Sequence, residues 1–241
     1  MHKKVLITGA SRGIGKAIAK KLAAEQYDLY LTCLHSEAAL QELAAELHSI
    51  YQVETSAFVC DMASSQQVQA LFQNIPSLDV LINNAGISYT GLLSEMSVED
   101  WAHVMDVNLN SLFYTSRHAI PLMLQKHSGQ ILNISSVWGS VGASMEVAYS
   151  TSKGGVNAFT KALARELAPS NIQINAVSCG YIDTKMNAAY SPEEVSSIIE
   201  EIPADRIGTP EEAAAMVSCV LQMPSYTTGQ IFTIDGGWQN S

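Results

Sequence analysis

Short apolar runs alternate with helical periods through the first third of the chain. Residues 3–8 form an aliphatic and β-branched run that stops at Gly9, and residues 13–26 then repeat apolar side chains at helical spacing. The same alternation predicts strands over 29–33, 53–59 and 80–83, and helices over 37–48 and 64–72. Strands that alternate with helices favour a parallel sheet covered on both faces.

The rest of the chain continues this pattern with longer helices. We predict a helix over 98–126, opened by Ser97 as N-cap with Asp100 at the third helical position. Further strands are predicted over 130–134, 172–177 and 230–234, and further helices from Tyr149 to near Pro169 and over 210–222. Residues 181–208 are polar and contain Pro192 and Pro203, so we expect a mobile excursion there rather than core.

These elements define the expected fold class. They predict an α/β chain with a Rossmann-type, doubly wound parallel sheet of about seven strands and helices on both faces. With 241 residues and 47% hydrophobic content, the chain is long enough to bury a sizeable core. We expect residues 1–241 to form a single domain.

Charge and composition exclude several classes of partner. The net charge is −10, from 13 basic and 23 acidic residues, and no basic run is present, which disfavours nucleic acid. No stretch approaches the roughly 18 apolar residues of a membrane span, and the first apolar run is too short for a signal peptide. We therefore expect a cytoplasmic protein that does not contact a membrane.

Cysteine and histidine spacing gives no sign of a metal site. The four cysteines are far apart and form no Cys-x-x-Cys pair, and the six histidines show no ligand pattern. We expect reduced thiols and no structural metal.

A glycine-rich turn follows the first predicted strand. It reads TGASRGIG, with glycines at positions 9, 13 and 15. Glycine allows a tight turn and a close approach of phosphate to backbone N–H groups, while the start of the next helix supplies partial positive charge. A plain strand-to-helix turn also favours glycine, but three glycines directly after the first strand of an α/β chain favour a dinucleotide site.

Polar residues follow other predicted strands. Asp61 and Met62 come just after one strand, and the run Asn83, Asn84, Ala85 and Gly86 follows the next. Ligands bind outside the carboxyl ends of parallel strands, so both groups are expected on the cofactor side. The alternative for the second group is an ordinary turn, which Asn and Gly favour.

Candidate chemistry is concentrated between residues 135 and 153. Ser136 lies thirteen residues before Tyr149, and Lys153 follows four residues later. Residues four apart share a helix face, so the Lys153 ammonium can lie beside the Tyr149 ring and favour loss of the phenolic proton, whose pKa is otherwise about 10. Tyr-x-x-x-Lys also occurs by chance. Asn108, inside a predicted helix, is either an ordinary surface residue or a functional group.

Together these motifs resemble the short-chain dehydrogenase/reductase family in its small, single-domain form. The resemblance rests on TGASRGIG, NNAG, the helix containing Asn108, the Ser136, Tyr149 and Lys153 set, and the closing DGG at 235–237, and it covers essentially the whole chain. It implies that Tyr149 protonates a carbonyl oxygen as hydride arrives from a nicotinamide. Ser136 would orient that oxygen, and Asn108 would anchor a water that reconnects Lys153 to solvent.

The resemblance also implies a set of cofactor contacts. Lys153 would bind the nicotinamide ribose and lower the pKa of Tyr149, so both residues belong to the catalytic and the cofactor-binding sets. The other implied contacts are Gly9, Ser11, Arg12, Gly13, Ile14 and Gly15 at the pyrophosphate and adenosine, Asp61 and Met62 at the adenine, Asn84 and Gly86 at the ribose, and Ile182 at the carboxamide.

The choice of cofactor can be argued from charge. An NAD site uses a carboxylate after the second strand, and that charge would repel a 2′-phosphate. Here Cys33, Leu34 and His35 hold the candidate positions, and Arg12 can pair with phosphate. We expect NADPH/NADP, although Leu34 stands where many NADP-using relatives place a second basic residue.

The subgroup that the chain most resembles is the bacterial 3-oxoacyl-[acyl-carrier-protein] reductases, homotetramers of fatty-acid synthesis that reduce a 3-oxoacyl thioester. The sequence differs from that subgroup in two places. His127 and Ser170 stand where the subgroup has basic residues that bind the acidic carrier, and Cys179-Gly180 stands where it usually has Pro-Gly. The chain also resembles a Gram-positive branch proposed to reduce a 5-aminopentanone group on elongation factor P. The alternative that is not an enzyme is a catalytically silent relative that binds NADP as a sensor.

Overall fold

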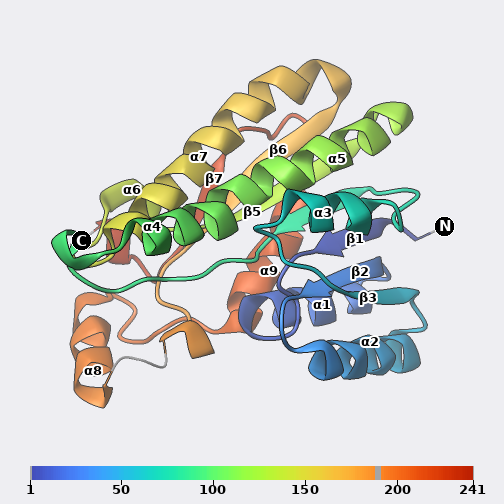
Figure 1. Cartoon of the computed structure of the whole chain (residues 1–241). Coiled ribbons are helices and arrows are strands. Elements are labelled where there is room, and N and C mark those ends of the chain that lie inside the picture. The colour runs from blue at the N-terminus through green and yellow to red at the C-terminus, as the bar shows by residue number, and fades with distance from the viewer. Residues whose placement is uncertain (1, 188–190, 241) are drawn as a thin grey trace.

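Seven parallel strands form one sheet within residues 2–187 and 191–240, the part of the chain that the computed structural model describes. Their order across the sheet is β3-β2-β1-β4-β5-β6-β7 (Figure 1). Their bounds are β1 Lys4–Ile7, β2 Asp28–Cys33, β3 Thr55–Val59, β4 Val80–Asn83, β5 Gly129–Ser136, β6 Ile172–Cys179 and β7 Ile231–Ile234. The predicted doubly wound parallel sheet is confirmed, and the strands begin and end within two residues of their predicted positions.

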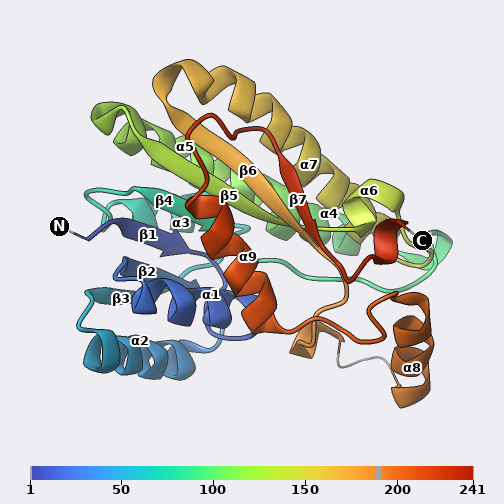
Figure 2. The ribbon, with the colours of Figure 1, turned by 180° about the vertical axis from the view of Figure 1, so that it is seen from behind.

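Helices cover both faces of the sheet, as Figures 1 and 2 show from opposite sides. One layer contains α1 (Gly13–Ala24), α2 (Glu37–Tyr51) and α9 (Pro210–Leu221), and the other α3 (Ser65–Phe72), α4 (Val98–Met105), α5 (Ser111–Lys126) and α7 (Val147–Leu167). Two further helices, α6 (Trp138–Val141) and α8 (Pro192–Glu201), lie near the carboxyl ends of the strands.

Alternate strand residues divide the interior into two hydrophobic cores. Val5 and Ile7 of β1 pack with α1, α2 and α9, whereas Leu6 between them packs with α3, α5 and α7. In the same way, Leu81 of β4 belongs to the second core and its neighbours in the strand to the first. Because successive side chains of a strand point to opposite faces, a strand buried on both faces is apolar throughout, which is what made these runs recognisable.

The order of strands reverses at β1 and β4, and this junction organises the carboxyl edge of the sheet. The chain leaves β1 for one face and β4 for the other, which opens a crevice above the two strand ends. The backbone N–H groups of Asn84 and Ala85 both donate to Thr8 Oγ1, each at 3.0 Å. The glycine turn and the NNAG turn are therefore held side by side.

The helix predicted over 98–126 is interrupted. Ser97 caps it as expected, with Oγ accepting from the Asp100 N–H at 3.0 Å, but Asp106–Asn110 form a π-helical turn between α4 and α5. A π turn adds one residue to a helical turn and is frequent at functional sites. This turn contains Asn108, so its unusual backbone coincides with a candidate site residue.

The expectation of an excursion without core residues over 181–208 is wrong for most of that segment. It contains α8, which begins with a capping box in which Ser191 Oγ accepts from the Glu194 N–H and the Glu194 carboxylate accepts from the Ser191 N–H. Ile182 and Ile202 are buried, at 4% and 2% exposure. Residues 188–190 lie outside the described residues. The Ser-x-x-Glu signature was the available sign of this helix.

Candidate active site

Ser136 is the last residue of β5, so it lies at the carboxyl edge of the sheet. It pairs in register with Cys179 of β6, and its Oγ accepts a hydrogen bond from the Trp138 N–H at 3.2 Å. The short helix α6 follows at once. This local bond orients the hydroxyl while leaving its own proton available to a substrate oxygen.

Tyr149 and Lys153 lie one turn apart on α7, as the spacing predicted. Lys153 Nζ is 5.6 Å from the centroid of the Tyr149 ring. The ammonium also donates to the Ile134 carbonyl oxygen at 2.9 Å, so it is anchored to β5. The structure thus brings the two side chains together and connects them to the strand that bears Ser136.

Burial changes the acidity of Lys153 itself. The side chain is 5% exposed, and loss of water lowers the pKa of its ammonium to about 8, partly offset by the influence of Cys179. The charged form still predominates at neutral pH. Burial likewise raises the pKa of the Cys179 thiol to about 12, so this cysteine, which replaces the expected proline, stays protonated.

The first half of α7 is fixed against β5 and α6. Ser135 Oγ donates to Asn157 Oδ1 at 2.7 Å. A side chain at Gly139 would place its Cβ 2.6 Å from the Lys153 carbonyl carbon, so only glycine allows α6 to pack this closely. Tyr149 and Lys153 therefore stand on a firmly packed helix, which precise positioning of reacting groups requires.

Asn108 connects the π turn to two other candidate segments. Its Nδ2 donates to the Ile87 carbonyl at 2.9 Å and to Ser152 Oγ at 3.0 Å, and its Oδ1 accepts from the Ile87 N–H at 2.8 Å. Both amide N–H groups are thus used within the protein. A water at Asn108 would have to bind a carbonyl oxygen, so the water-anchoring role stays a prediction.

The glycine turn has the geometry that a pyrophosphate needs. Gly9 and Gly13 have φ of 67° and 54°, and a Cβ on Gly15 would lie 2.3 Å from the Gly9 carbonyl oxygen. The first turn of α1, residues 13–16, contains no acidic side chain to repel an anion. Helix N-termini of this kind bind phosphate through backbone N–H groups. The residues present therefore fit a dinucleotide cofactor.

The NNAG turn lies between the glycine turn and the candidate residues Asn108 and Lys153. Asn84 Nδ2 donates to the carbonyl oxygens of Thr8 and Gly9, at 2.9 and 3.0 Å, so its amide supports the glycine turn. A Cβ on Gly86 would be 3.4 Å from Asn108 Oδ1 and 3.6 Å from Lys153 Nζ. Gly86 therefore lies within contact distance of both Asn108 and Lys153.

The remaining predicted contacts occupy the same edge. Asp61 comes directly after Cys60, whose N–H donates a hydrogen bond to the Cys33 carbonyl oxygen. The Asp61 Oδ1 accepts from the Ala63 N–H at 2.9 Å. Met62 is buried against Thr32, while Ile182 pairs with Gly208 at the start of the segment that contains α8. Ser11 and Ile14 belong to the glycine turn and are half-buried, and Arg12 beside them is exposed.

Two carboxylates near this edge were not predicted from the sequence. Glu37, in the first turn of α2, raises the pKa of the Cys33 thiol, after the larger effect of burial, so it lies near the end of β2. Glu146 is 8% exposed and immediately precedes α7. For Glu146 a signal existed, since an acidic residue three positions before Tyr149 must lie within one helical turn of it.

Across residues 2–187 and 191–240, no helix is both long and apolar enough to cross a bilayer. The same residues include no cluster of three or more His, Cys, Asp or Glu side chains arranged to hold a metal ion.

Comparisons with known proteins agree with the geometry. A family model described as short chain dehydrogenase matches residues 3–195. The 3-oxoacyl-[acyl-carrier-protein] reductase FabG of Aquifex aeolicus is 39% identical over 96% of this chain and 95% of its own length. YmfI of Bacillus subtilis, described as an uncharacterized oxidoreductase, is 38% identical over 99% of both chains.

Solved structures extend the similarity to the whole fold. A putative gluconate dehydrogenase from Agrobacterium tumefaciens is 30% identical with a TM-score of 0.93, covering 99% of this chain and 96% of that one. YwfH, described as an NADPH-dependent reductase involved in bacilysin biosynthesis, is 26% identical with a TM-score of 0.94 and full coverage of both chains.

Proposed function

Because this chain belongs to the short-chain dehydrogenase family and is an oxidoreductase that acts on alcohol and carbonyl groups, we propose that it reduces a ketone to a secondary alcohol with NADPH. The observation that carries the proposal is that Lys153 Nζ lies 5.6 Å from the Tyr149 ring centroid and donates to the Ile134 carbonyl of β5, the strand that ends at Ser136. A Tyr-x-x-x-Lys pair that occurred by chance would have no reason to lie at the carboxyl edge of the sheet, next to a turn suited to phosphate.

Each residue has a distinct part in the proposed reaction. NADPH, when bound, supplies a hydride to the carbonyl carbon. Tyr149 donates its phenolic proton to the carbonyl oxygen, and the Ser136 hydroxyl donates a hydrogen bond that orients this oxygen. The Lys153 ammonium stabilises the phenolate that Tyr149 becomes, because an adjacent positive charge favours the ionised form. Asn108 holds the Ile87 backbone and α7 in place around them.

The family relatives suggest a 3-oxoacyl thioester as the first substrate to test, as the name of the Aquifex relative implies. One structural observation weakens a carrier-linked form of it. Lys126, the cation left where His127 and Ser170 replace basic residues, donates to Asp79 Oδ1 at 2.7 Å and to Ser77 Oγ at 3.0 Å. This lysine is already paired, so an acidic carrier gains less from it.

Because Lys126 is already paired, we retain a second candidate substrate, an aminopentanone group on elongation factor P. The two substrates differ in recognition and not in chemistry. A direct comparison of an acetoacetyl thioester with aminopentanone-modified elongation factor P, followed by NADPH absorbance, distinguishes them. Tight NADPH binding with no turnover of any carbonyl compound would instead favour the silent sensor and contradict the proposed reaction.

Cofactor preference depends on Arg12. We expect NADPH to bind at least about tenfold more tightly than NADH, because a charge-assisted contact with the 2′-phosphate is worth roughly 1.5–3 kcal/mol. Arg12→Ala should remove most of the difference in titrations of either cofactor.

Glu37→Gln provides the matched control for this cofactor test. If Glu37 served as the carboxylate of an NAD site, its removal would weaken NADH binding. We expect NADH affinity to be unchanged and NADPH affinity to be equal or higher. Equal affinities of the wild-type protein for the two cofactors would refute the assignment.

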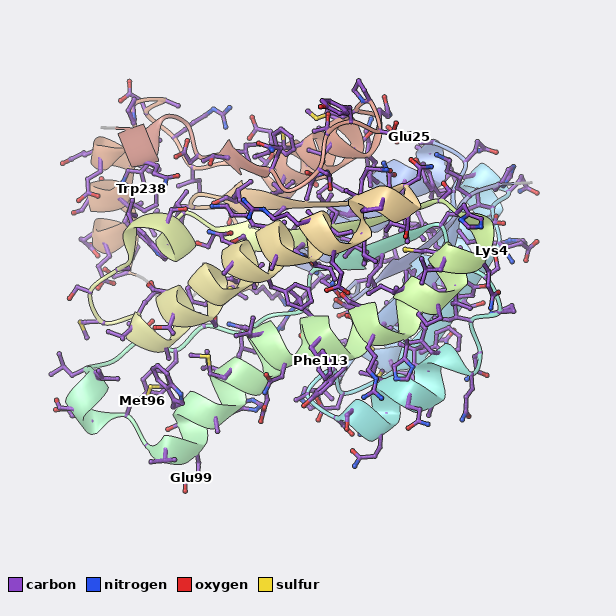
Figure 3. All side chains as sticks on the ribbon, turned by 90° about the horizontal axis from the view of Figure 1, so that it is seen from above. Lys4, Glu25, Met96, Glu99, Phe113 and Trp238 are labelled. Carbon is purple, nitrogen blue, oxygen red and sulfur yellow. The ribbon has the colours of Figure 1, made fainter. Side chains whose placement is uncertain are left out.

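We also propose that the protein assembles as a homotetramer through α5 and α7. Figure 3 looks onto this layer, where Phe113 of α5 is labelled, and that side chain is 50% exposed. Exposed aromatic area on long neighbouring helices is typical of subunit interfaces. Light scattering at micromolar concentration should give about four times the 26.0 kDa chain mass. A protein that stays monomeric at that concentration would disprove the assembly.

We propose a cytoplasmic location on chemical grounds. Cys33, Cys60 and Cys179 are buried free thiols, and Cys219 is an exposed one. Free thiols persist where glutathione and thioredoxin keep cysteines reduced.

A further inference from the structure

The helix α8 is not held in place by burial of its own side chains. None of its residues, Pro192–Glu201, is buried. A cavity of about 120 Å³ lies between the segment that follows α8 and the end of β7, and its lining includes Ile182, Ile202 and Ile234. Well-packed interiors leave few voids larger than a water molecule. The position of α8 therefore depends on a few specific contacts.

The segment that contains α8 begins and ends at the proposed cofactor site. The Asp183 N–H donates to the Gly208 carbonyl oxygen at 2.9 Å, and the Gly208 N–H donates to the Tyr181 carbonyl oxygen at 2.9 Å. A Cβ on Gly13 of the glycine turn would lie 3.4 Å from Thr184 Cγ2. These contacts fix the two ends of the segment, but they leave the direction of α8 between them undetermined.

The first turn of α8 borders the part of the crevice where α7 begins. Burial raises the pKa of the Tyr181 hydroxyl, and nearby negative charges, those of Glu194 and Glu146 among them, raise it further. Glu194 belongs to the first turn of α8, and Glu146 immediately precedes α7. Because salt and water screen charges beyond about 10 Å, both helices must start close to the same tyrosine.

Trp238 connects the other end of α8 to α6. It is the first residue of the 3₁₀ turn η5 (Trp238–Asn240), and its Nε1 donates to Glu201 Oε2 at 3.2 Å. Its indole meets that of Trp138 edge to face, with ring centroids 4.7 Å apart and planes at 63°. Edge-to-face pairs are favourable beyond the area that they bury. Figure 3 labels Trp238, and we call Trp138, Trp238 and Glu201 the tryptophan bridge.

The α6 side of the tryptophan bridge is anchored in the protein. The Trp138 N–H donates to Ser136 Oγ at 3.2 Å, and a Cβ on Gly139 would lie 2.6 Å from the Lys153 carbonyl carbon, so α6 packs directly on α7. The helix α8 has no comparable attachment of its own. The tryptophan bridge therefore transfers the fixed position of α6 to α8.

The turn that bears Trp238 is also well ordered by hydrogen bonds. The Asp235 carboxylate accepts from the Gly237 N–H at 2.9 Å and from the Gln239 N–H at 2.8 Å. The Gly236 carbonyl oxygen accepts from the Ala204 N–H at 3.1 Å, just beyond α8. The indole of Trp238 thus extends from a backbone that is fixed on both sides.

We propose that Trp238 is a positioning residue that holds α8 beside the proposed ketone site by joining Glu201 to Trp138. This role rests on the proposed ketone reduction and concerns how its substrate is bound. A wall of the site that is already in place loses less conformational entropy when a substrate binds against it. The tryptophan bridge therefore lowers KM for the ketone and has little effect on the chemical step.

Hydrogen exchange followed by mass spectrometry tests the tryptophan bridge without any need for activity. Trp238→Phe keeps an aromatic ring against Trp138 but removes the N–H that Glu201 accepts, whereas Glu201→Ala removes the acceptor. We expect the amides of α8 to exchange at least about threefold faster in each variant, as for loss of one hydrogen bond. The double variant should exchange no faster than either single variant, because residues in direct contact are not additive.

Two controls accompany these variants. Glu201→Gln keeps an acceptor oxygen, so it should restore the wild-type exchange of α8. Glu200→Ala changes an exposed carboxylate of the same helix and should leave the exchange unchanged.

Kinetics with an acetoacetyl thioester test the consequence for the substrate. Trp238→Phe should raise KM for the thioester at least about threefold, while kcat and the NADPH dissociation constant stay within about twofold. Cofactor affinity is kept because the pairing of Ile182 with Gly208 is untouched by this variant. A general loss of folded protein would instead lower kcat and leave KM unchanged.

The two measurements separate this role from the proposed function. Unchanged exchange of α8 in Trp238→Phe, or faster exchange with an unchanged KM, overturns the role of Trp238 while ketone reduction stands. If the wild-type protein reduces no ketone, the proposed function is wrong, and calorimetry of the thioester with the NADP⁺ complex replaces KM. Weaker binding to Trp238→Phe than to the wild-type protein then supports the role, and equal or absent binding overturns it.

Discussion

Replacing Tyr149 with phenylalanine should reduce the turnover number for ketone reduction by about 10²- to 10⁴-fold, the loss expected when a general acid is removed. The ring is kept, so its packing beside Lys153, at 5.6 Å, is preserved and only the proton donor is lost. Dissociation constants for NADPH should therefore stay within about twofold of the wild-type value. The measurement pairs steady-state NADPH absorbance with a fluorescence titration of the cofactor.

Ser136→Ala is the informative companion to this variant. It removes a hydrogen bond to the carbonyl oxygen, and its loss of turnover should not add fully to that of Tyr149→Phe, because residues that act as one unit are not additive. A Tyr149→Phe protein that reduces ketones at close to the wild-type rate would show that the proton comes from another group.

Lys153→Ala should damage turnover and cofactor binding together. One side chain is proposed to serve both, since Lys153 lies beside the phenol and next to Gly86 of the turn proposed to meet the ribose. We expect at least about a tenfold rise in the NADPH dissociation constant, as for loss of a charged hydrogen bond, and a loss of turnover comparable to that of Tyr149→Phe. An NADPH affinity unchanged by Lys153→Ala would contradict the second role.

The acidity of Lys153 predicts a pH dependence with a definite sign. Burial lowers the pKa of the ammonium to about 8 in the free protein, so the charged form is lost as pH rises through that value. The ratio kcat/KM for NADPH reports on groups of the free enzyme, and we expect it to fall above pH about 8. A profile that stays flat to pH 10 would mean that the charge of Lys153 is not needed for productive binding.

The sequence predicted those parts of the site that depend on strand ends and helical spacing. Tyr149 and Lys153 share a helix face because four residues make slightly more than one helical turn. The TGASRGIG and NNAG turns follow buried strands, where parallel sheets bind ligands. These relations are local, or follow from the topology, so a single chain reveals them. The fold class and the order of elements were accessible for the same reason.

Features that depend on contacts between residues far apart in the chain could not be predicted from the sequence. The π turn at Asn108 interrupts a helix whose apolar spacing looks continuous, and it is fixed by bonds to Ile87, 21 residues away. Glu146 looks like an ordinary acidic residue until its bond to Ser88, 58 residues away, shows that it points into the protein. The paired state of Lys126 depends on Asp79, which no local pattern connects to it.

The most direct measurement of the central claim follows a deuterium atom. NADPH carrying deuterium at the transferred position of the nicotinamide is mixed with the protein and a ketone substrate, and the alcohol product is analysed by mass spectrometry. If this chain is a ketone reductase, the product gains one deuterium at the carbinol carbon, and Tyr149→Phe forms the same labelled product far more slowly. Tight binding of the labelled NADPH without any deuterated alcohol, across a panel of ketones, would contradict the account.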